Sequence, residues 1–284
     1  MTTRRDVVKA LAAIAAAGAL PRTARAASTD PAARDSIERI GLQLYTVRGL
    51  MAKDMPGTLA AVAAFGYREV EFAGYFGRTP SEVNQLLRDN GLTAPSTHLG
   101  LNDVRAGLDA TVESAKAIGV RYLTVASLDM RAIKSGDDWK RTADVFSEVG
   151  RLVKAAGLRF AYHNHAVEFT PVNGVLPMDE LITRTDPALV TFELDLYWAI
   201  KAGQDPLAFF GRYPGRFEMV HVKDATAAPA LAMTDVGAGS VDWTRIFAAH
   251  ESAGIRHYFV EHDNPTDPMA SIRQSAAYLK ALRF

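Results

Sequence analysis

Four short segments in the second half of the chain carry residue types that bind metal ions and transfer protons. Each segment ends or follows an apolar run typical of a buried strand. Asp195 and His221 lie 26 residues apart, and Glu261 follows 40 residues after His221. This spacing is typical of strand–helix units and is too long for a zinc finger. The segments are His163-Asn164-His165 with Glu168, Glu193-Leu194-Asp195, His221-Val222-Lys223-Asp224 and Glu261-His262-Asp263.

Strand alternation places one pair of polar side chains from each segment on a single face, because residues i and i+2 point the same way. If the strands are parallel neighbours, their carboxyl ends bring these pairs together at one mouth. Carboxylates buried together are costly without a cation, since like charges repel and lose their water. Histidine nitrogens and carboxylate oxygens suit Mn²⁺, Co²⁺, Zn²⁺ or Mg²⁺, so we expect one divalent metal ion there. The pairs are His163 with His165, Glu193 with Asp195, His221 with Lys223, and Glu261 with Asp263.

These segments belong to a regular alternation of strand-like and helix-like runs over residues 40–284. Helix-like runs stop at glycines such as Gly66 and Gly119, and no Gly/Ser/Pro-rich linker interrupts the series. Eight alternations predict a single α/β domain, a (β/α)8 TIM barrel, with an open doubly wound sheet as the alternative. The predicted strands are Ile40–Val47, Arg68–Ala73, Thr93–Leu99, Tyr122–Ser127, Leu158–His163, Val190–Leu196, Glu218–Val222 and His257–Glu261.

Residues 1–26 are predicted to be a twin-arginine export signal that is not part of the fold. Arg4-Arg5 begins the pattern, an Ala-rich apolar stretch covers Ala10–Leu20, and Ala24-Arg25-Ala26 is a small-x-small cleavage site. The apolar stretch is too short for a stable membrane span. A retained Ala-rich helix or an uncleaved anchor is the alternative. We therefore predict a periplasmic or exported protein, with residues 27–39 as an N-terminal linker and residues 40–284 as the barrel.

Composition limits which partners the chain can bind and which residue types can hold a metal ion. The chain of 284 residues has a formal net charge of +0, and residues 1–26 hold five basic residues and one acidic residue, so their removal leaves −4. An acidic chain does not favour a nucleic-acid partner, because nucleic acids bind basic surfaces. No cysteine is present, so disulfides and thiolate ligands are excluded. Any metal ion must therefore be held by histidine and carboxylate.

A series of short motifs accompanies the four segments: Ile40–Arg48, Glu69–Phe72, Ser96–His98, Tyr162–Phe169, Asp195–Trp198, His221–Asp224 and Val260–His262. With these motifs, nearly all of residues 40–284 resemble the sugar phosphate isomerase/epimerase superfamily, the xylose-isomerase-like TIM barrels of the AP endonuclease 2 type. The resemblance implies that Asp195, His221 and Glu261 are metal ligands. The epimerases have a glutamate at the end of strand five, where this chain has His163. Glu168 follows five residues later, so both residues are candidates for the fourth ligand. Glu168 is the preferred one, with His163 close by.

The resemblance also implies a reaction. In the epimerases, two glutamates exchange the substrate α-proton while the metal polarises the carbonyl and stabilises an enediolate. Here Glu261 keeps that role, and His163 or His165 supplies the second acid or base. We predict a divalent-metal-dependent isomerase or epimerase that acts on a sugar, keto-sugar or cyclitol. The alternative in the same site is a lyase that eliminates a β-oxygen from an inosose or 3-keto-glycoside, since inosose dehydratases of this superfamily have a comparable His-rich strand five.

Five further residues are predicted to bind the substrate, and several have structural alternatives. Trp198 could instead pack in the core, and Lys223 could pair with Asp224. Glu193, which has no assigned role, could pair with Lys201. The substrate-binding residues are Gln43, Glu71, His98, Trp198 and Lys223.

Three other functions are weaker on this sequence. Gly237-Ala238-Gly239-Ser240 precedes a helix and could bind a phosphate, but a plain turn is favoured. A non-catalytic periplasmic sugar-binding barrel would not need Asp195, His221 and Glu261. An endonuclease would call for more histidine ligands and a basic groove.

Overall fold

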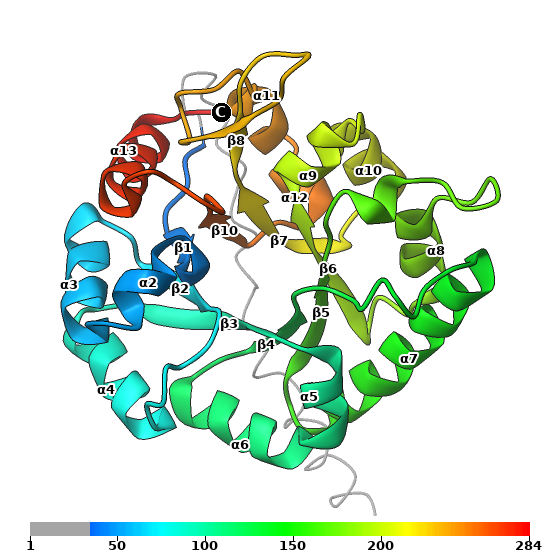
Figure 1. Ribbon diagram of the computed structural model, residues 1–284, viewed down its shortest axis with the longest axis horizontal. Helices are drawn as coiled ribbons and strands as arrows, with labels where there is room; N and C mark the ends of the chain where they lie inside the picture. The colour runs from blue at the N-terminus through cyan, green and yellow to red at the C-terminus, as the bar shows by residue number, and fades with distance from the viewer. Residues whose placement is uncertain (1–34) are drawn as a thin grey trace, which may run out of the picture. The chain divides into compact units, whose positions relative to one another are not determined.

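The computed structural model describes residues 35–284, which form a closed barrel of eight parallel strands with helices around it (Figure 1). The last barrel strand pairs with the first, with Ile40 opposite Tyr258. The predicted (β/α)8 TIM barrel is confirmed, and the open doubly wound sheet is wrong because the sheet closes on itself. The barrel strands are β1 Ile40–Gln43, β2 Glu69–Phe72, β3 Thr93–Leu99, β4 Tyr122–Val125, β5 Arg159–His163, β6 Val190–Asp195, β7 Phe217–Val222 and β10 His257–Val260.

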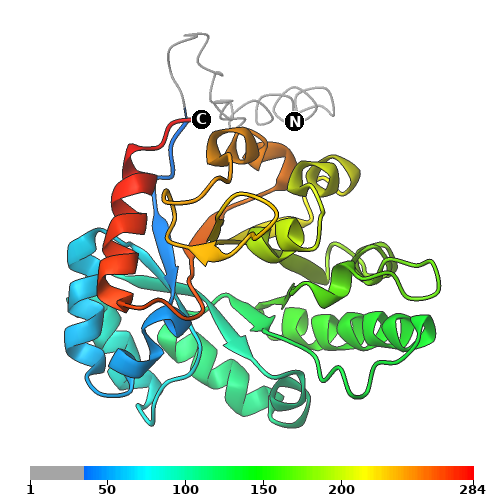
Figure 2. The same cartoon turned by 45° about the horizontal axis from the view of Figure 1, so that its top comes forward.

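Helices outside the barrel connect consecutive strands. Several helices are preceded by a residue whose side chain accepts a hydrogen bond from a backbone N–H of the first turn. Asp54 before α3 and Thr79 before α4 are examples. Figure 2 shows the last helix, α13, beside β1, so the two ends of the described chain meet there. The helices are α2 Arg48–Met51, α3 Met55–Phe65, α4 Pro80–Asp89, α5 Leu101–Ala106, α6 Leu108–Ile118, α7 Gly136–Ala155, α8 Pro177–Arg184, α9 Leu196–Lys201, α10 Pro206–Arg212, α11 Trp243–Phe247, α12 His250–Ala253 and α13 Pro268–Ala281, with 3-10 turns η1 Leu44–Val47 and η2 Val167–Phe169.

The predicted strands agree with the structure to within two residues at each end, with one exception. The first was predicted to run to Val47, but β1 ends at Gln43. The side chain of Gln43 accepts a hydrogen bond from the backbone N–H of Tyr45, and this local bond starts the 3-10 turn η1. A short hairpin of β8 Asp224–Ala225 and β9 Met233–Thr234 was not predicted.

The predicted export signal at residues 1–26 lies outside the described residues, so it stays a prediction. Part of the predicted linker at 27–39 does belong to the fold. Asp35 and Phe284 exchange two backbone hydrogen bonds of 2.7 and 3.0 Å, and Ile37 is buried. Within residues 35–284, none of the helices is long and apolar enough to cross a bilayer.

The inside of the barrel changes from apolar to polar toward the carboxyl ends of the strands. Tyr122, Ala161, Met219 and Phe259 form a buried apolar cluster. Two residues further along their strands lie Thr124, His163, His221 and Glu261, which are buried but polar. The polar groups at the mouth therefore rest on a packed apolar floor.

We predict that Gly41→Ala lowers the free energy of unfolding by about 1–3 kcal/mol through overpacking of this floor. A Cβ at Gly41 would lie 2.5 Å from Cδ1 of Phe259 and 2.9 Å from the carbonyl oxygen of Tyr258. Gly49→Ala is the matched control, because its Cβ would meet no atom within 4 Å and alanine favours the helix. Urea unfolding of both variants measures the difference, and equal stability of Gly41→Ala and the parent would contradict it.

Candidate active site at the barrel mouth

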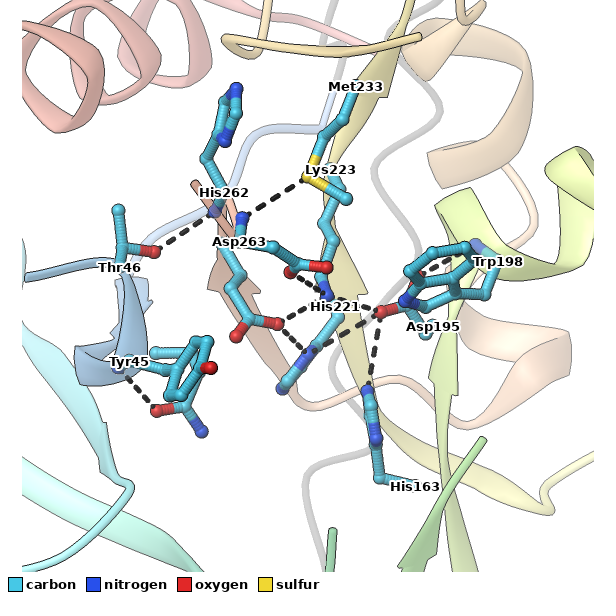
Figure 3. Close-up of polar contacts among 12 residues, drawn as sticks. Tyr45, Thr46, His163, Asp195, Trp198, His221, Lys223, Met233, His262 and Asp263 are labelled. Atoms are coloured by element: carbon cyan, nitrogen blue, oxygen red, sulfur yellow. Dashed lines mark hydrogen bonds and ion pairs between the residues drawn. The ribbon is translucent and has the colours of Figure 1, made fainter. Parts of the chain in front are cut away.

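Four side chains converge where β5, β6, β7 and β10 end. His163, Asp195, His221 and Glu261 each offer one ligand atom, and these atoms lie within 4.8 Å of one another. Nε2 of His163 is 3.3 Å from Oδ2 of Asp195 (Figure 3). Nδ1 of His221 is 2.8 Å from Oε2 of Glu261. The strand register explains the convergence, because Asp195 of β6 lies directly opposite His221 of β7. We call these four residues the ligand group.

His221 is oriented by carboxylates beneath it. Its Nε2 lies 2.8 Å from Oε2 of Glu71 and 3.2 Å from Oε2 of Glu193, and all three residues are fully buried. Its Nδ1 makes no hydrogen bond within residues 35–284, even though Glu261 is close. Nδ1 is therefore the nitrogen that faces the other members of the ligand group.

The ligand group fits a divalent metal ion. The closest contacts between its donor atoms, 2.8 and 3.3 Å, match the spacing of about 3 Å expected for neighbouring ligands with bonds of roughly 2.0–2.2 Å. Nδ1 of His221 is buried without a hydrogen bond, which is unusual unless another partner binds there. Two imidazoles and two carboxylates form a mixed nitrogen–oxygen set of the kind that holds Mn²⁺, Co²⁺ or Zn²⁺.

Opposite charges hold the buried group together. Burial alone would lower the pKa of His221, but the carboxylates of Glu193 and Glu261 outweigh it and raise that pKa well above its usual value. Burial alone would raise the pKa of Asp195, but Lys223 and the nearby histidines lower it to about 2. At neutral pH the carboxylates are therefore ionised and available to bind a cation.

Lys223, which the sequence predicts to bind the substrate, lines the cavity, but its ammonium is already held by three carboxylates. Its ammonium is buried and lies 3.0 Å from Asp195, 2.6 Å from Glu261 and 2.7 Å from Asp263. The alternative pairing with Asp224 is also wrong, because Asp224 accepts from backbone and indole N–H groups instead. Lys223 thus fixes carboxylates from both strands that flank β7.

Glu168, predicted to be the fourth ligand, lies outside the ligand group. Its side chain accepts hydrogen bonds from the hydroxyl of Tyr162 and, at 2.8 Å, from the backbone N–H of His165. The 3-10 turn η2 holds it in this buried position, and burial raises its pKa to about 7. His163 takes the place at the end of β5, and its Nδ1 is 3.0 Å from the carbonyl oxygen of Ala126.

His165 lines the cavity with a ring that makes no hydrogen bond to the described residues. Its ring lies 4.9 Å from the His163 ring and 5.9 Å from Trp198, and no hydrogen bond from the described residues reaches it. Burial, and then the neighbouring His163, lower its pKa to about 3. A neutral imidazole offers one donor and one acceptor, so His165 can serve both functions toward a ligand.

Of the other predicted substrate-binding residues, some line the cavity and others are buried beneath it. His98 lines the cavity, and its Nε2 is 2.7 Å from Oε2 of Glu193, so the pairing of Glu193 with Lys201 is wrong. Gln43 and Glu71 are fully buried below the cavity, where the amide of Gln43 donates to Glu71 at 2.7 Å. They therefore support the site from beneath and do not line it. Trp198 is half-buried, and its indole N–H has no partner within residues 35–284.

The mouth opens into a cavity of about 640 Å³. Asp103 and Asn264 also line it, and the sequence did not single them out because neither stands at a predicted strand end: Asp103 lies in α5 and Asn264 in the loop after β10. Their only sequence signal is that they follow barrel strands. The full lining is Tyr45, Ala73, Gly74, His98, Leu99, Gly100, Asp103, Ala126, Ser127, His163, His165, Lys223, Glu261, Asp263 and Asn264.

The glycine-rich segment after β7 is a turn and not a phosphate site. Asp224 accepts hydrogen bonds from the backbone N–H groups of Gly237 at 2.9 Å and Val241 at 3.2 Å, and from the indole of Trp243 at 3.0 Å. These N–H groups are used inside the protein. The favoured turn is therefore the correct interpretation.

Together, the closed barrel and the ligand group define a TIM-barrel protein with a buried histidine–carboxylate centre at the carboxyl ends of its strands. The chain belongs to the xylose isomerase-like TIM barrel family, which matches residues 59–282.

Similar proteins carry the names of sugar and cyclitol enzymes. The inosose dehydratase of Lacticaseibacillus casei is 34% identical over 140 residues, which cover 44% of this chain and 46% of that protein. The match thus spans about half the length of that curated relative. A crystal structure of a sugar phosphate isomerase/epimerase from Parabacteroides distasonis is 26% identical, covers 92% of this chain and 98% of its own, and has a TM-score of 0.76. A zinc-containing structure of IOLI protein, 16% identical with a TM-score of 0.69 over 85% of this chain and 96% of its own, shares the fold.

We predict that the purified protein binds one divalent ion and that His163→Gln weakens binding by at least about 100-fold, more than the usual loss of an outer partner. Glu168→Gln is the matched control and should bind as the parent does, because Glu168 lies outside the ligand group. Titration calorimetry with Mn²⁺ and Zn²⁺ provides the affinities. Strong binding by His163→Gln together with weak binding by Glu168→Gln would reverse the assignment.

We also expect Glu71→Ala to weaken metal binding about 10- to 100-fold, because the carboxylate that orients His221 is lost. Glu71→Gln keeps an acceptor oxygen within reach of Nε2 and should lose less. The same calorimetry, with circular dichroism to check the fold, separates these variants. Parent-like affinity in Glu71→Ala would show that packing alone orients His221.

Proposed function

We propose that this chain is a metal-dependent lyase that removes the proton beside the carbonyl of a keto-sugar or keto-cyclitol and eliminates the oxygen on the next carbon. The observation that carries the proposal is the composition of the ligand group. His163 stands where a second carboxylate would be needed for proton exchange on both faces of a sugar carbon. One carboxylate oxygen of that group, Oε1 of Glu261, makes no polar contact with the described residues.

Glu261 is placed to act as the base. Its Oε2 is held by His221 and Lys223, while the residue lines the cavity and its pKa lies well below the usual range. Burial alone would raise that pKa, but Lys223 and then His221 outweigh burial. The carboxylate is therefore ionised and can accept a proton at Oε1.

The elimination then needs no further reactant. Glu261 takes the proton from the carbon beside the carbonyl, the carbon–oxygen bond on the next carbon breaks, and a carbon–carbon double bond forms. The departing oxygen takes up the proton from Glu261, and neutral His165 can orient that oxygen through its N–H group. A divalent ion held by the ligand group would polarise the carbonyl and so make the neighbouring proton easier to remove.

Similarity to the inosose dehydratases supports elimination, although that match spans only part of each chain. An isomerase or epimerase is the second candidate, because the Parabacteroides distasonis isomerase/epimerase structure matches 92% of the chain. In that reaction the proton would return to the same or the neighbouring carbon and no oxygen would leave. A sugar-binding protein without turnover would not depend on the free oxygen of Glu261.

Export remains part of the proposal, on the support of the Arg4-Arg5 pattern and the Ala24-Arg25-Ala26 site. Replacement of both arginines by lysine should keep the protein inside the cell. Fractionation of cells that express the full chain measures this.

We predict that metal-loaded protein converts an inosose or a 3-keto-glycoside to a product that lacks one water or one alcohol. Glu261→Gln should lower kcat by roughly 100- to 10,000-fold without loss of the fold, because the base is removed. Mass spectrometry and NMR in deuterated water identify the product. A product of unchanged mass that carries deuterium would favour epimerisation, and turnover by Glu261→Gln at the parent rate would exclude both reactions as described.

A further inference from the structure

The cavity extends well beyond the ligand group. Its lining includes His163, His165 and Glu261, and also residues after β1 to β4, such as Tyr45 and Asp103. Because β1 pairs with β10, the turn that carries Tyr45 lies next to the strand that leads to Glu261. The cavity volume of about 640 Å³ falls among pockets of roughly 300–1,000 Å³, which hold ligands larger than one six-membered ring. A single keto-sugar at the ligand group would therefore fill only part of the cavity.

Tyr45 presents an aromatic side chain to the cavity. The residue lines the cavity and is 42% exposed, and its hydroxyl makes no hydrogen bond within residues 35–284. The guanidinium of Arg48 lies 3.9 Å from the ring centroid and covers one face of the ring. In the view of Figure 3, the Tyr45 ring lies on the other side of His221 from Asp195.

Arg48 fixes this ring relative to the reacting groups. It donates hydrogen bonds to the carbonyl oxygens of Tyr45 at 2.8 Å and Asp263 at 2.9 Å, and to the side chain of Asn264 at 2.9 Å. Asp263 and Asn264 follow Glu261 on the loop after β10. The aromatic face is therefore tied to the loop that carries the base, as a rigid binding surface requires.

We propose that the substrate has two parts: a keto ring over the ligand group, and a second ring, sugar or aryl, stacked on Tyr45. This rests on the proposed lyase, and it identifies the substrate class as a glycoside of a keto-sugar. The leaving group is then the alcohol that carries the second ring. Glu261 takes the proton beside the carbonyl, the glycosidic carbon–oxygen bond breaks, a double bond forms, and the released alcohol takes the proton.

Binding of unreactive probes tests the second ring without turnover. The probes are the 4-nitrophenyl and methyl glucosides, both anomers, on the metal-loaded full chain by titration calorimetry. The aryl glucoside of one anomer should bind about 2- to 12-fold more tightly than its methyl partner, as expected for one aromatic stacking contact. Tyr45→Ala should remove this difference, and Tyr45→Phe should retain it.

Phe76→Ala is the matched control. Phe76 is 41% exposed but does not line the cavity, so this variant should keep the preference for the aryl probe. Equal binding of aryl and methyl probes by the parent, or the same loss for both probes in Tyr45→Ala, would overturn the proposal. An aryl preference that depends on Tyr45 in a protein without lyase activity would instead reject the reaction and keep the binding surface.

Discussion

The structure depends on the compensation of negative charge buried inside one end of the barrel. Four carboxylates are buried there, and in a low-dielectric interior they would repel one another and destabilise the fold. Lys223 and the histidines hold them through short contacts, and a divalent ion would add the remaining positive charge. The need for compensation thus fixes the rotamers of the side chains that would carry out the chemistry. The carboxylates are Glu71, Glu193, Asp195 and Glu261.

The rest of the molecule supports this group in two places. Below it, an apolar cluster around Met219 and Phe259 fills the barrel. Around the rim, Asp224 accepts a backbone hydrogen bond from Gly237 in the loop after β7. Arg48, after the turn that follows β1, donates a hydrogen bond to the loop after β10. The first of these contacts lies within one loop, and the second joins segments that are far apart in sequence. Loops as well as strands therefore hold the mouth in place.

Strand positions could be read from the sequence because apolar runs and glycine-terminated helices repeat in a regular order. The first strand was predicted too long, since Leu44–Val47 is as apolar as the strand and the bond from Tyr45 to Gln43 leaves no mark in that pattern. Glu168 was assigned as a ligand because its residue type matched. Its side chain points to Tyr162, and only the path of the turn η2 reveals this.

The sequence by itself determined the eight strand–helix units, the absence of thiolate ligands, and the strand ends that carry Asp195, His221 and Glu261. These follow from residue types and local periodicity, which act over a few residues. The tertiary structure decided that His163 completes the ligand group and that Glu71 orients His221 across 150 residues. These features depend on barrel closure and side-chain rotamers, which arise only when distant strands pack against one another.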